Sequence, residues 1–271
     1  MPRRLGQHFL RDQRIVAQIV RALRLDANDH VVEIGAGRGV LTRQLARAGS
    51  RVTAIEIDRG LVKALQNEFD ERGNVSVIHA NALDLDPCMF GSAHTDVRVE
   101  PSAYKLAGNL PYYITGSLLR HYLGSACRPR MAVLMIQLEV AQRMLATPGD
   151  MNLLAVATQL YAQPSLVVKV PASAFAPPPK VESAVVKLDV LAEPLVPHSS
   201  AFFTVVRAGF STRRKQLANA LANGLGTSKS EASLMLKRAD IDPTRRAQDL
   251  SLEDWGRLSF VAAELGVDSA T

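Results

Sequence analysis

Three glycines at alternate positions after a short apolar run constrain the fold of this chain more than any other feature. The run from Val31 to Ile34 is rich in β-branched residues, and Gly35, Gly37 and Gly39 follow it before a segment with helical periodicity. This order predicts a strand, a glycine-rich turn and the start of a helix. Open α/β sheets bind nucleotides at the carboxyl end of such a strand, where glycine lets the backbone approach a ligand closely.

The spacing of these glycines distinguishes two classes of nucleotide-binding turn. A dinucleotide-binding turn has the spacing Gly-x-Gly-x-x-Gly, and Val40 stands where its third glycine is needed. The turn found here, Gly-x-Gly-x-Gly preceded by Glu33, instead resembles the S-adenosylmethionine loop of class I methyltransferases. We therefore expect S-adenosylmethionine rather than a nicotinamide cofactor.

Polar residues end the next two predicted strands. Glu56 ends the strand that begins at Arg51, where a carboxylate can accept hydrogen bonds from both hydroxyls of a ribose. Asn81 follows the predicted strand that begins at Val75, and its side chain suits the adenine edge of a cofactor. For each residue the alternative is a solvated loop position.

The run Asn109-Leu110-Pro111-Tyr112 supplies what methylation of an exocyclic adenine amine requires. The N6 lone pair is delocalised into the purine ring, so the amine must be held in a pyramidal geometry, and an asparagine oxygen and a backbone carbonyl can both accept from it. Pro111 has no N–H and restricts Leu110 to an extended conformation, which leaves the adjacent carbonyl free. Tyr112 offers a ring face to an unstacked base. The alternative is an ordinary strand end followed by a turn and a buried tyrosine.

In combination these motifs resemble the ribosomal RNA adenine N6,N6-dimethyltransferase family, in particular its bacterial small-subunit branch. The similarity extends to Gly6-Gln-His-Phe-Leu10, to Phe175-Ala-Pro-Pro-Pro-Lys-Val-Glu-Ser183 and to Phe210-Ser-Thr-Arg-Arg-Lys215. It implies an α/β fold of the class I methyltransferase type, with a Rossmann-like, mostly parallel sheet of seven strands and a small C-terminal all-α domain. The implied reaction is N6,N6-dimethylation of two adjacent adenines in the 3′-terminal hairpin of 16S ribosomal RNA, on an assembling small subunit.

The resemblance also implies the site residues. The catalytic set, which holds and sandwiches the target base, is Asn109, Leu110, Pro111, Tyr112 and Phe175. The cofactor-binding set is His8, Leu10, Gly35, Gly37, Glu56, Ile57, Asn81, Ala82 and Asn109. At His8 and Asn81 the chain departs from the commonest family pattern, and Asn81 lacks the charge of the usual aspartate, so we expect weaker cofactor binding. For Phe175 the alternative is a core aromatic followed by a linker.

The charge balance indicates an anionic partner. The formal net charge is +6 and the isoelectric point is about 9.5, and most basic clusters lie in the last third of the chain, where they would face RNA phosphates. The expected RNA-binding residues are Arg207, Arg213, Arg214, Lys215, Arg245 and Arg246. For any single pair the alternative is a solvated helix face. An aromatic content of 5% argues against a broad platform for stacking single-stranded bases.

Strand-like and helical segments alternate along the first two thirds of the chain. Further strand-like runs cover residues 105–107, 131–137, 166–170 and 184–190, and the resemblance implies that the last two form an antiparallel hairpin at one edge of the sheet. The composition then shifts, which predicts a linker at 191–200 between a catalytic domain at 1–190 and a helical RNA-binding domain at 201–271. Ser230 or Ser251 is expected to cap a helix of this domain.

Several classes of protein and site are not favoured. Cys88 and Cys127 form no CxxC motif and no cluster with histidine, so we expect neither a disulfide framework nor a metal site. The sequence contains no apolar run of signal-peptide or membrane-spanning length. We therefore expect a cytoplasmic protein without a membrane partner, and a monomer by default.

Three alternative functions differ from the favoured one. A large-subunit RNA dimethylase of the macrolide-resistance type has a similar core, although the proline-rich segment at Phe175 and the long helical C-terminus favour the small-subunit branch. An assembly checkpoint would require RNA binding with methylation secondary. A DNA adenine methyltransferase is disfavoured because Leu110 stands where its motif usually has a second proline.

Overall fold

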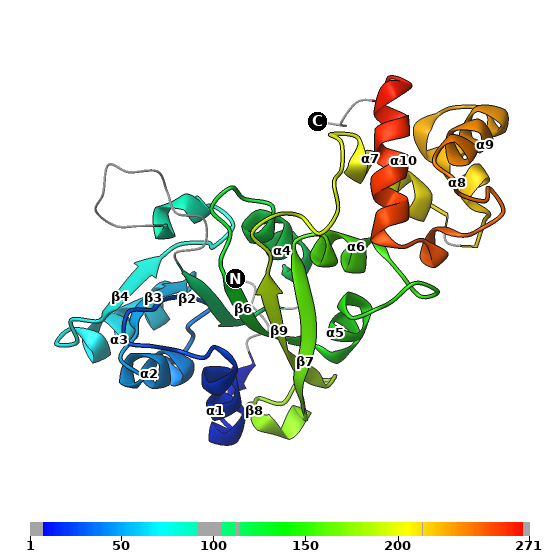
Figure 1. The fold of residues 1–271 in the computed structure, drawn as a ribbon. Coiled ribbons are helices and arrows are strands. Elements are labelled where there is room, and N and C mark those ends of the chain that lie inside the picture. Colours follow the sequence, from blue (N-terminus) through cyan, green and yellow to red (C-terminus); the bar gives the residue numbers. More distant parts are fainter. Residues whose placement is uncertain (1–7, 92–103, 112–113, 213, 268–271) are drawn as a thin grey trace. The chain divides into compact units, whose positions relative to one another are not determined.

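The computed structural model describes residues 8–91, 104–111, 114–212 and 214–267 (Figure 1). The chain divides into two compact units, of which the first comprises Met1–Gln142 and Tyr161–Ala192 and the second Arg143–Leu160 and Glu193–Thr271. The C-terminal part of the second unit begins at Glu193, within the linker expected at 191–200. Residues 143–160, which lie within the expected catalytic domain, group with the C-terminal helices instead.

A mostly parallel seven-stranded sheet is the centre of the first unit (Figure 1). Its strands are β2 (His30–Ile34), β3 (Arg51–Glu56), β4 (Val75–His79), β5 (Lys105–Asn109), β6 (Met131–Gln137), β7 (Ala162–Val170) and β9 (Ser183–Val190). The spatial order is β4-β3-β2-β5-β6-β9-β7. Strand β9 pairs in the antiparallel sense with both β6 and β7, and the other neighbouring strands pair in parallel. The predicted α/β fold class and the antiparallel pair at the sheet edge are thus confirmed.

Three amphipathic helices follow the first strands: α1 (Gln13–Ala22), α2 (Val40–Arg47) and α3 (Arg59–Phe69). Asp12 caps the N-terminus of α1, since its carboxylate accepts a hydrogen bond from the Arg14 amide at 2.9 Å. Ile19 of α1 and Leu45 of α2 are buried in one core cluster with Val31 of the sheet. Burial of each such side chain contributes about 1.5–3 kcal/mol, and together they fix both helices on one face of the sheet.

A second, two-stranded sheet joins distant parts of the chain. Strand β1 (Phe9–Leu10) pairs antiparallel with β8 (Phe175–Ala176), which follows the short 3₁₀ helix η2 (Ala172–Ala174). In this pairing Phe9 lies opposite Ala176 and Leu10 opposite Phe175. The sequence does not predict this pair, because a two-residue strand has no periodicity to detect.

A buried ion network supports the amino end of β5. The Lys105 ammonium donates to the carbonyls of Leu23 and Arg24 at 2.8 Å and to the Asp29 carboxylate at 2.7 Å. Arg130 forms an ion pair with the same carboxylate. Burial lowers the pKa of Lys105, but three acceptors match the three donors of its ammonium. The network thereby anchors the end of α1 to the sheet.

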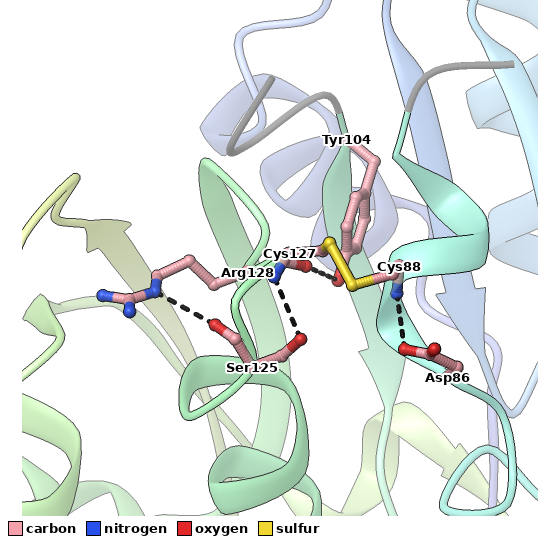
Figure 2. The surroundings of a disulfide bond; sticks show 6 residues. All are labelled: Asp86, Cys88, Tyr104, Ser125, Cys127 and Arg128. Carbon is pink, nitrogen blue, oxygen red and sulfur yellow. Dashed lines mark hydrogen bonds between the residues drawn. A yellow bond between two sulfur atoms is a disulfide. The ribbon is translucent and has the colours of Figure 1, made fainter. Parts of the chain in front are cut away.

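The structure contradicts the expectation that the two cysteines are unconnected. Cys88 lies in the 3₁₀ helix η1 (Pro87–Phe90) and Cys127 follows α4 (Thr115–Leu123), and a disulfide joins them (Figure 2). Their separation of 39 residues gave no local signal. The Tyr122 hydroxyl of α4 also connects the two segments, since it donates to the Ala82 carbonyl at 3.1 Å, a contact that spacing alone does not indicate.

The second unit is helical, as predicted for the C-terminal region. Its main helices are α6 (Leu153–Gln159), α7 (Phe202–Phe210), α8 (Leu217–Leu225), α9 (Lys229–Arg238) and α10 (Leu252–Glu264), with α5 (Leu138–Met144) at the boundary between the units and the 3₁₀ helix η3 (Ala247–Asp249) before α10. Ser251 caps α10, as expected. The expected cap at Ser230 is wrong: Ser228 caps α9 in a reciprocal pair with Glu231, and Ser230 lies inside the helix.

Close helix packing in the second unit depends on two glycines. A Cβ atom added at Gly224 of α8 would lie 2.5 Å from the Ala208 Cα of α7. A Cβ added at Gly209 would lie 2.5 Å from the ring of Trp255, which is fully buried. Helices α7, α8 and α10 therefore meet at a distance that larger residues do not permit. Across the described ranges, no helix is both long enough and apolar enough to span a membrane.

Candidate cofactor and substrate site

The predicted site residues of the first unit gather at the carboxyl edge of the parallel strands. The glycine-rich turn follows β2, Glu56 ends β3, Asn81 lies two residues after β4, and Asn109 ends β5. Because neighbouring parallel strands end at the same edge of a sheet, these four positions form one row. Along the sheet the order is Asn81, Glu56, the glycine-rich turn and Asn109, which differs from their order in the chain.

The backbone of the glycine-rich turn requires glycine. Gly35 and Gly37 have φ values of 72° and 57°, in the left-handed region that side chains disfavour. An added Cβ at Gly35 would also lie 3.4 Å from the Asn109 carbonyl oxygen, and one at Gly37 would lie 3.4 Å from the Phe9 ring. The turn therefore lies against both the end of β5 and the N-terminal segment, which places three of the predicted motifs together.

The Glu56 carboxylate is fixed by backbone donors. Its Oε2 accepts from the Gly37 amide at 2.8 Å, and its Oε1 accepts from the amides of Ile57 and Asp58 at 2.9 Å. Oε2 retains capacity for a further donor, as a ribose hydroxyl requires. The Ile57 side chain beside it is 50% exposed, and such an apolar surface suits one face of an adenine ring.

Glu33 is a buried acid that was missing from the predicted site residues. It is 2% exposed, and its Oε2 accepts from the Thr42 hydroxyl at 2.6 Å. Burial, with a contribution from the Glu56 charge, raises the pKa of Glu33 to about 8. Its signal in the sequence was an acidic residue inside the apolar run of β2. A cationic ligand in the adjoining cavity would stabilise the ionised form of this carboxyl.

Asn109 is oriented by the N-terminal segment. Its side-chain Nδ2 donates to the His8 carbonyl at 3.0 Å, which leaves Oδ1 as the acceptor of this amide. The His8 ring lies 2.8 Å, through Nδ1, from the Pro177 carbonyl oxygen. The segment thus connects the end of β5 with the proline-rich segment after β8. The backbone of Leu110 is held by the Met135 carbonyl of β6 at 3.0 Å.

The remaining residues of the predicted catalytic set lie as follows. Leu110 is buried and Pro111 is exposed. Tyr112 lies outside the described residues. The Phe175 side chain is 4% exposed and belongs to the same core cluster as Leu10. The structure therefore brings Phe175 to the site through its backbone pairing with β1, while its ring is packed in the core.

The segment after β4 folds back on itself. Asn81 accepts from the Leu83 amide through Oδ1 at 3.2 Å and donates to the Asp84 carboxylate through Nδ2 at 3.2 Å. Ala82 is buried, and its carbonyl accepts from Tyr122. Asn81 Oδ1 has a second lone pair, which can accept from an adenine amine while the contact with Leu83 is kept.

A small cavity lies between the glycine-rich turn and the N-terminal segment. Its volume is about 40 Å³, enough for a few water molecules. Its walls include Phe9, Leu10, Glu33, Gly35, Gly37 and Asn109. The Arg38 guanidinium lies 4.5 Å from the centre of the Phe9 ring. The cavity is partly open to solvent.

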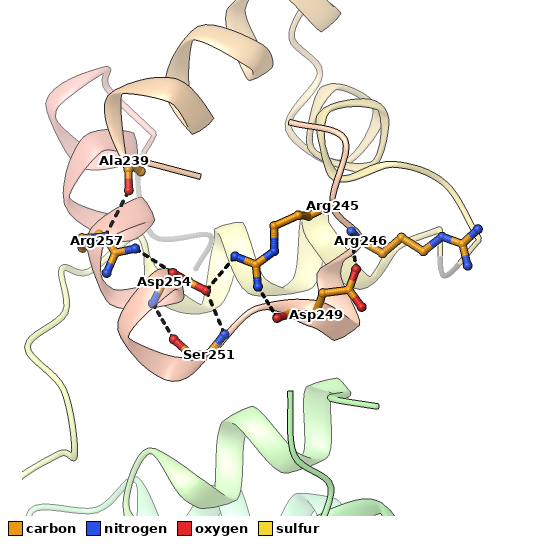
Figure 3. Close-up of polar contacts among 7 residues, drawn as sticks. All are labelled: Ala239, Arg245, Arg246, Asp249, Ser251, Asp254 and Arg257. Carbon is orange, nitrogen blue, oxygen red and sulfur yellow. Dashed lines mark hydrogen bonds and ion pairs between the residues drawn. The ribbon is translucent and has the colours of Figure 1, made fainter. Parts of the chain in front are cut away.

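The basic residues of the second unit differ in how they are held. Arg207, Arg214, Lys215 and Arg246 are exposed, and Arg213 lies outside the described residues. Arg245 is half-buried: its guanidinium forms an ion pair with Asp254 at 3.2 Å and donates to the Asp249 carbonyl (Figure 3).

The loop that carries Arg245 and Arg246 lies against the start of α8. The Leu217 amide donates to the Arg245 carbonyl at 2.7 Å. This places the exposed Arg246 close to the segment with Arg214 and Lys215. Asp254, which also pairs with Arg257 at 2.6 Å, holds the loop in position (Figure 3).

No group of three or more histidine, cysteine, aspartate or glutamate side chains within the described part of the chain is placed to hold a metal ion.

Comparisons of the sequence with known proteins all indicate one family. The profile of the ribosomal RNA adenine dimethylase family matches residues 2–264. A ribosomal RNA small subunit methyltransferase A of Dehalococcoides mccartyi is 44% identical over 262 residues, which cover 96% of this chain and 88% of that relative. A protein of the same name from Moorella thermoacetica is 44% identical over 260 residues, which cover 94% and 90% of the two chains.

Two solved structures share the fold over almost the whole chain. A dimethyladenosine transferase from Plasmodium falciparum matches with a TM-score of 0.79 and 27% identity, covering 96% of this chain and 99% of that one. The 23S rRNA methyltransferase ErmE matches with a TM-score of 0.69 and 27% identity, covering 93% and 98%.

Proposed function

Because the chain belongs to the ribosomal RNA adenine dimethylase family, a class of S-adenosylmethionine-dependent enzymes with the class I methyltransferase fold, we propose that its substrate is the small ribosomal subunit. The proposed reaction dimethylates N6 of two adjacent adenines in the 3′-terminal hairpin of 16S ribosomal RNA. The relatives at 44% identity carry the name of a small-subunit enzyme, which supports this choice over the large-subunit alternative.

The orientation of Asn109 is the observation on which the proposed chemistry rests. Its Nδ2 is committed to the His8 carbonyl, so Oδ1 can accept one hydrogen of the adenine amine while the Leu110 carbonyl accepts the other. These contacts direct the N6 lone pair toward the methyl donor. S-adenosylmethionine supplies a methyl group on a positively charged sulfur. When N6 forms its bond to that carbon, the carbon–sulfur bond breaks, a neutral thioether leaves, and water takes the proton from N6.

The residues around the cavity fit the proposed cofactor. Glu56 has a free acceptor position for a ribose hydroxyl, and Ile57 presents an exposed apolar surface beside it. Glu33 offers a buried carboxyl to a cation, and the cofactor carries both a sulfonium and an ammonium group. Asn81 and Ala82 then bind the adenine, and the target base lies against the Tyr112 ring. The Phe175 ring, which is buried in the core, must become exposed before it can contact the base.

The second unit supplies RNA contacts in this proposal. We assign the phosphate contacts to Arg207, Arg213, Arg214, Lys215 and Arg246. Arg245 has the different role of holding the loop, because its guanidinium is occupied by Asp254 and Asp249. The protein acts in this proposal as a monomer on the assembling small subunit.

Asn109→Ala tests the chemistry directly. We expect this variant to lose methyl transfer by roughly 100-fold, since misplacement of a reacting group costs about this much, while S-adenosylmethionine binding measured by calorimetry changes little. The matched control is Asn81→Ala, for which we expect weaker cofactor binding and a smaller change in the maximal rate. Equal losses of binding and transfer in Asn109→Ala would show that Asn109 mainly holds the cofactor.

The substrate is tested with purified particles. The protein is incubated with labelled S-adenosylmethionine and either unmethylated small subunits or large subunits, and modified adenines are mapped by mass spectrometry. We expect dimethyladenosine only in the small-subunit hairpin. Modification confined to large-subunit RNA would select the alternative that the similarity to ErmE keeps open. RNA binding without transfer would favour an assembly role.

A further inference from the structure

The disulfide between Cys88 and Cys127 is unexpected in a protein that modifies ribosomal RNA. Disulfides are rare in the reducing compartments where ribosomes are made, and those that occur there are usually transient and redox-sensing. The chain has no other cysteine. The location of this bond relative to the proposed cofactor site therefore determines what its reduction would do.

The Cys127 side of the bond is rigidly held. Cys127 is 5% exposed. Its amide donates to the Ser125 hydroxyl at 3.0 Å, and its carbonyl accepts from the Tyr104 hydroxyl at 3.1 Å (Figure 2). Cys88 is half-buried and belongs to a short 3₁₀ helix, where its amide donates to Asp86 at 2.9 Å. Breaking the bond therefore frees the Cys88 side more than the Cys127 side, while Phe90 of the same 3₁₀ helix stays packed on the Tyr104 ring.

The segment on the Cys88 side begins with the residues proposed to bind the cofactor adenine. Between Asn81 and Cys88 it is attached to α4 at two other points. The Ala82 carbonyl accepts from Tyr122 at 3.1 Å, and the Leu85 carbonyl lies 2.7 Å from Nε2 of His121. The disulfide is the third attachment of this segment and the only covalent one among the three. Its loss leaves the segment attached to α4 by these two hydrogen bonds and to the core by the buried Pro87 and Phe90. The stretch between these points then has more conformations to lose when a ligand binds.

We propose that Cys88 and Cys127 form a thiol–disulfide exchange site that controls the affinity for S-adenosylmethionine, with the oxidised protein binding more tightly. The inference rests on the proposed function through the assignment of Asn81 and Ala82 to the cofactor. The reductant is a dithiol. Its thiolate attacks the more accessible sulfur, that of Cys88; the S–S bond breaks, and the Cys127 sulfur leaves and takes a proton. The second thiol of the reductant then releases Cys88 as a thiol and forms a disulfide within the reductant.

Calorimetry compares the two redox forms of the full chain. Protein equilibrated with oxidised or with reduced dithiothreitol is titrated with S-adenosylmethionine after mass spectrometry has counted its free thiols. We expect the dissociation constant of the reduced form to be about five- to tenfold larger, at the lower end of known coupling between sites. The double variant Cys88→Ser/Cys127→Ser should match the reduced form and ignore the reductant.

A reciprocal measurement needs no enzyme activity. Because coupling is mutual, saturating S-adenosylmethionine must shift the thiol–disulfide equilibrium of the protein with dithiothreitol by the same factor. A tenfold coupling corresponds to about 30 mV in reduction potential. Hydrogen exchange should accelerate on reduction in peptides that cover residues 81–90 and stay unchanged in peptides from the strands of the sheet.

The possible results separate this inference from the proposed function. Equal S-adenosylmethionine affinities in the two redox forms, or two free thiols after oxidation, would overturn the exchange site and leave the proposed function intact. Accelerated exchange throughout the first unit would also overturn it, because the disulfide would then be a general brace. Absence of S-adenosylmethionine binding in both forms would instead overturn the proposed function.

Discussion

Glu33 makes the stability of the first unit depend on pH in a way that one substitution removes. Its pKa is raised from 4.5 to about 8 by burial, so the folded protein keeps the proton that the unfolded chain releases above pH 4.5. The contribution of this group is fully present below about pH 4.5 and is lost as pH rises toward 8. Between about pH 5.5 and pH 8 the loss amounts to about 3 kcal/mol, a factor of roughly 150 in the folding equilibrium.

Glu33→Gln removes the titrating group and keeps an oxygen that can accept from Thr42. We expect the wild type to lose about 3 kcal/mol relative to this variant over the same pH interval. Hydrogen exchange of peptides from β2 and β3 measures the opening free energy of the first unit. Fluorescence of Trp255, which is buried in the second unit, should respond to pH alike in both proteins and serves as the control.

Parallel pH profiles of the wild type and Glu33→Gln would refute the reasoning, because they would mean that Glu33 ionises like an exposed carboxylate. A profile that rises with pH in the wild type relative to the variant would refute it more strongly, since the sign would be reversed.

Two further substitutions test the packing of each unit. Lys105→Met should destabilise the first unit by about 3–5 kcal/mol in urea denaturation, because it leaves a buried carboxylate with an incomplete set of partners. Arg14→Ala, which removes an exposed ion pair, should have a much smaller effect. Gly224→Ala should destabilise the second unit by about 1–3 kcal/mol in Trp255-monitored unfolding, since its new methyl group meets Ala208. The same change at Gly116 of α4, with no neighbour within 4 Å, should be neutral or stabilising by up to about 1 kcal/mol. A stable Lys105→Met protein, or equal effects at the two glycines, would contradict these assignments.

The sequence predicted those parts of the site that depend on local patterns. The glycine-rich turn, Glu56 and Asn109 each end a strand with a clear apolar pattern, and the parallel arrangement brings strand ends together without further information. The same argument predicted the fold class, because alternating strands and helices leave few arrangements of a parallel sheet.

What the sequence did not reveal depends on contacts between distant segments. The pairing of Leu10 with Phe175 and the contact of Asn109 with the His8 carbonyl bridge gaps that no periodicity spans. The burial of Glu33, which raises its pKa, is a property of the assembled sheet and helix α2. The bond between Cys88 and Cys127 depends on how α4 packs.

The pairing of β1 with β8 also sets an order of events during protein synthesis. His8 and Pro177, which contact each other beside the cavity, are separated by 169 residues. At about 5–20 residues per second, a ribosome needs roughly 10–30 s to synthesise that stretch. For most of this interval the glycine-rich turn has been synthesised while β1 has no partner strand. The wall of the cavity that β1 forms is therefore held in place by its partner strand only after about two thirds of the chain has been made.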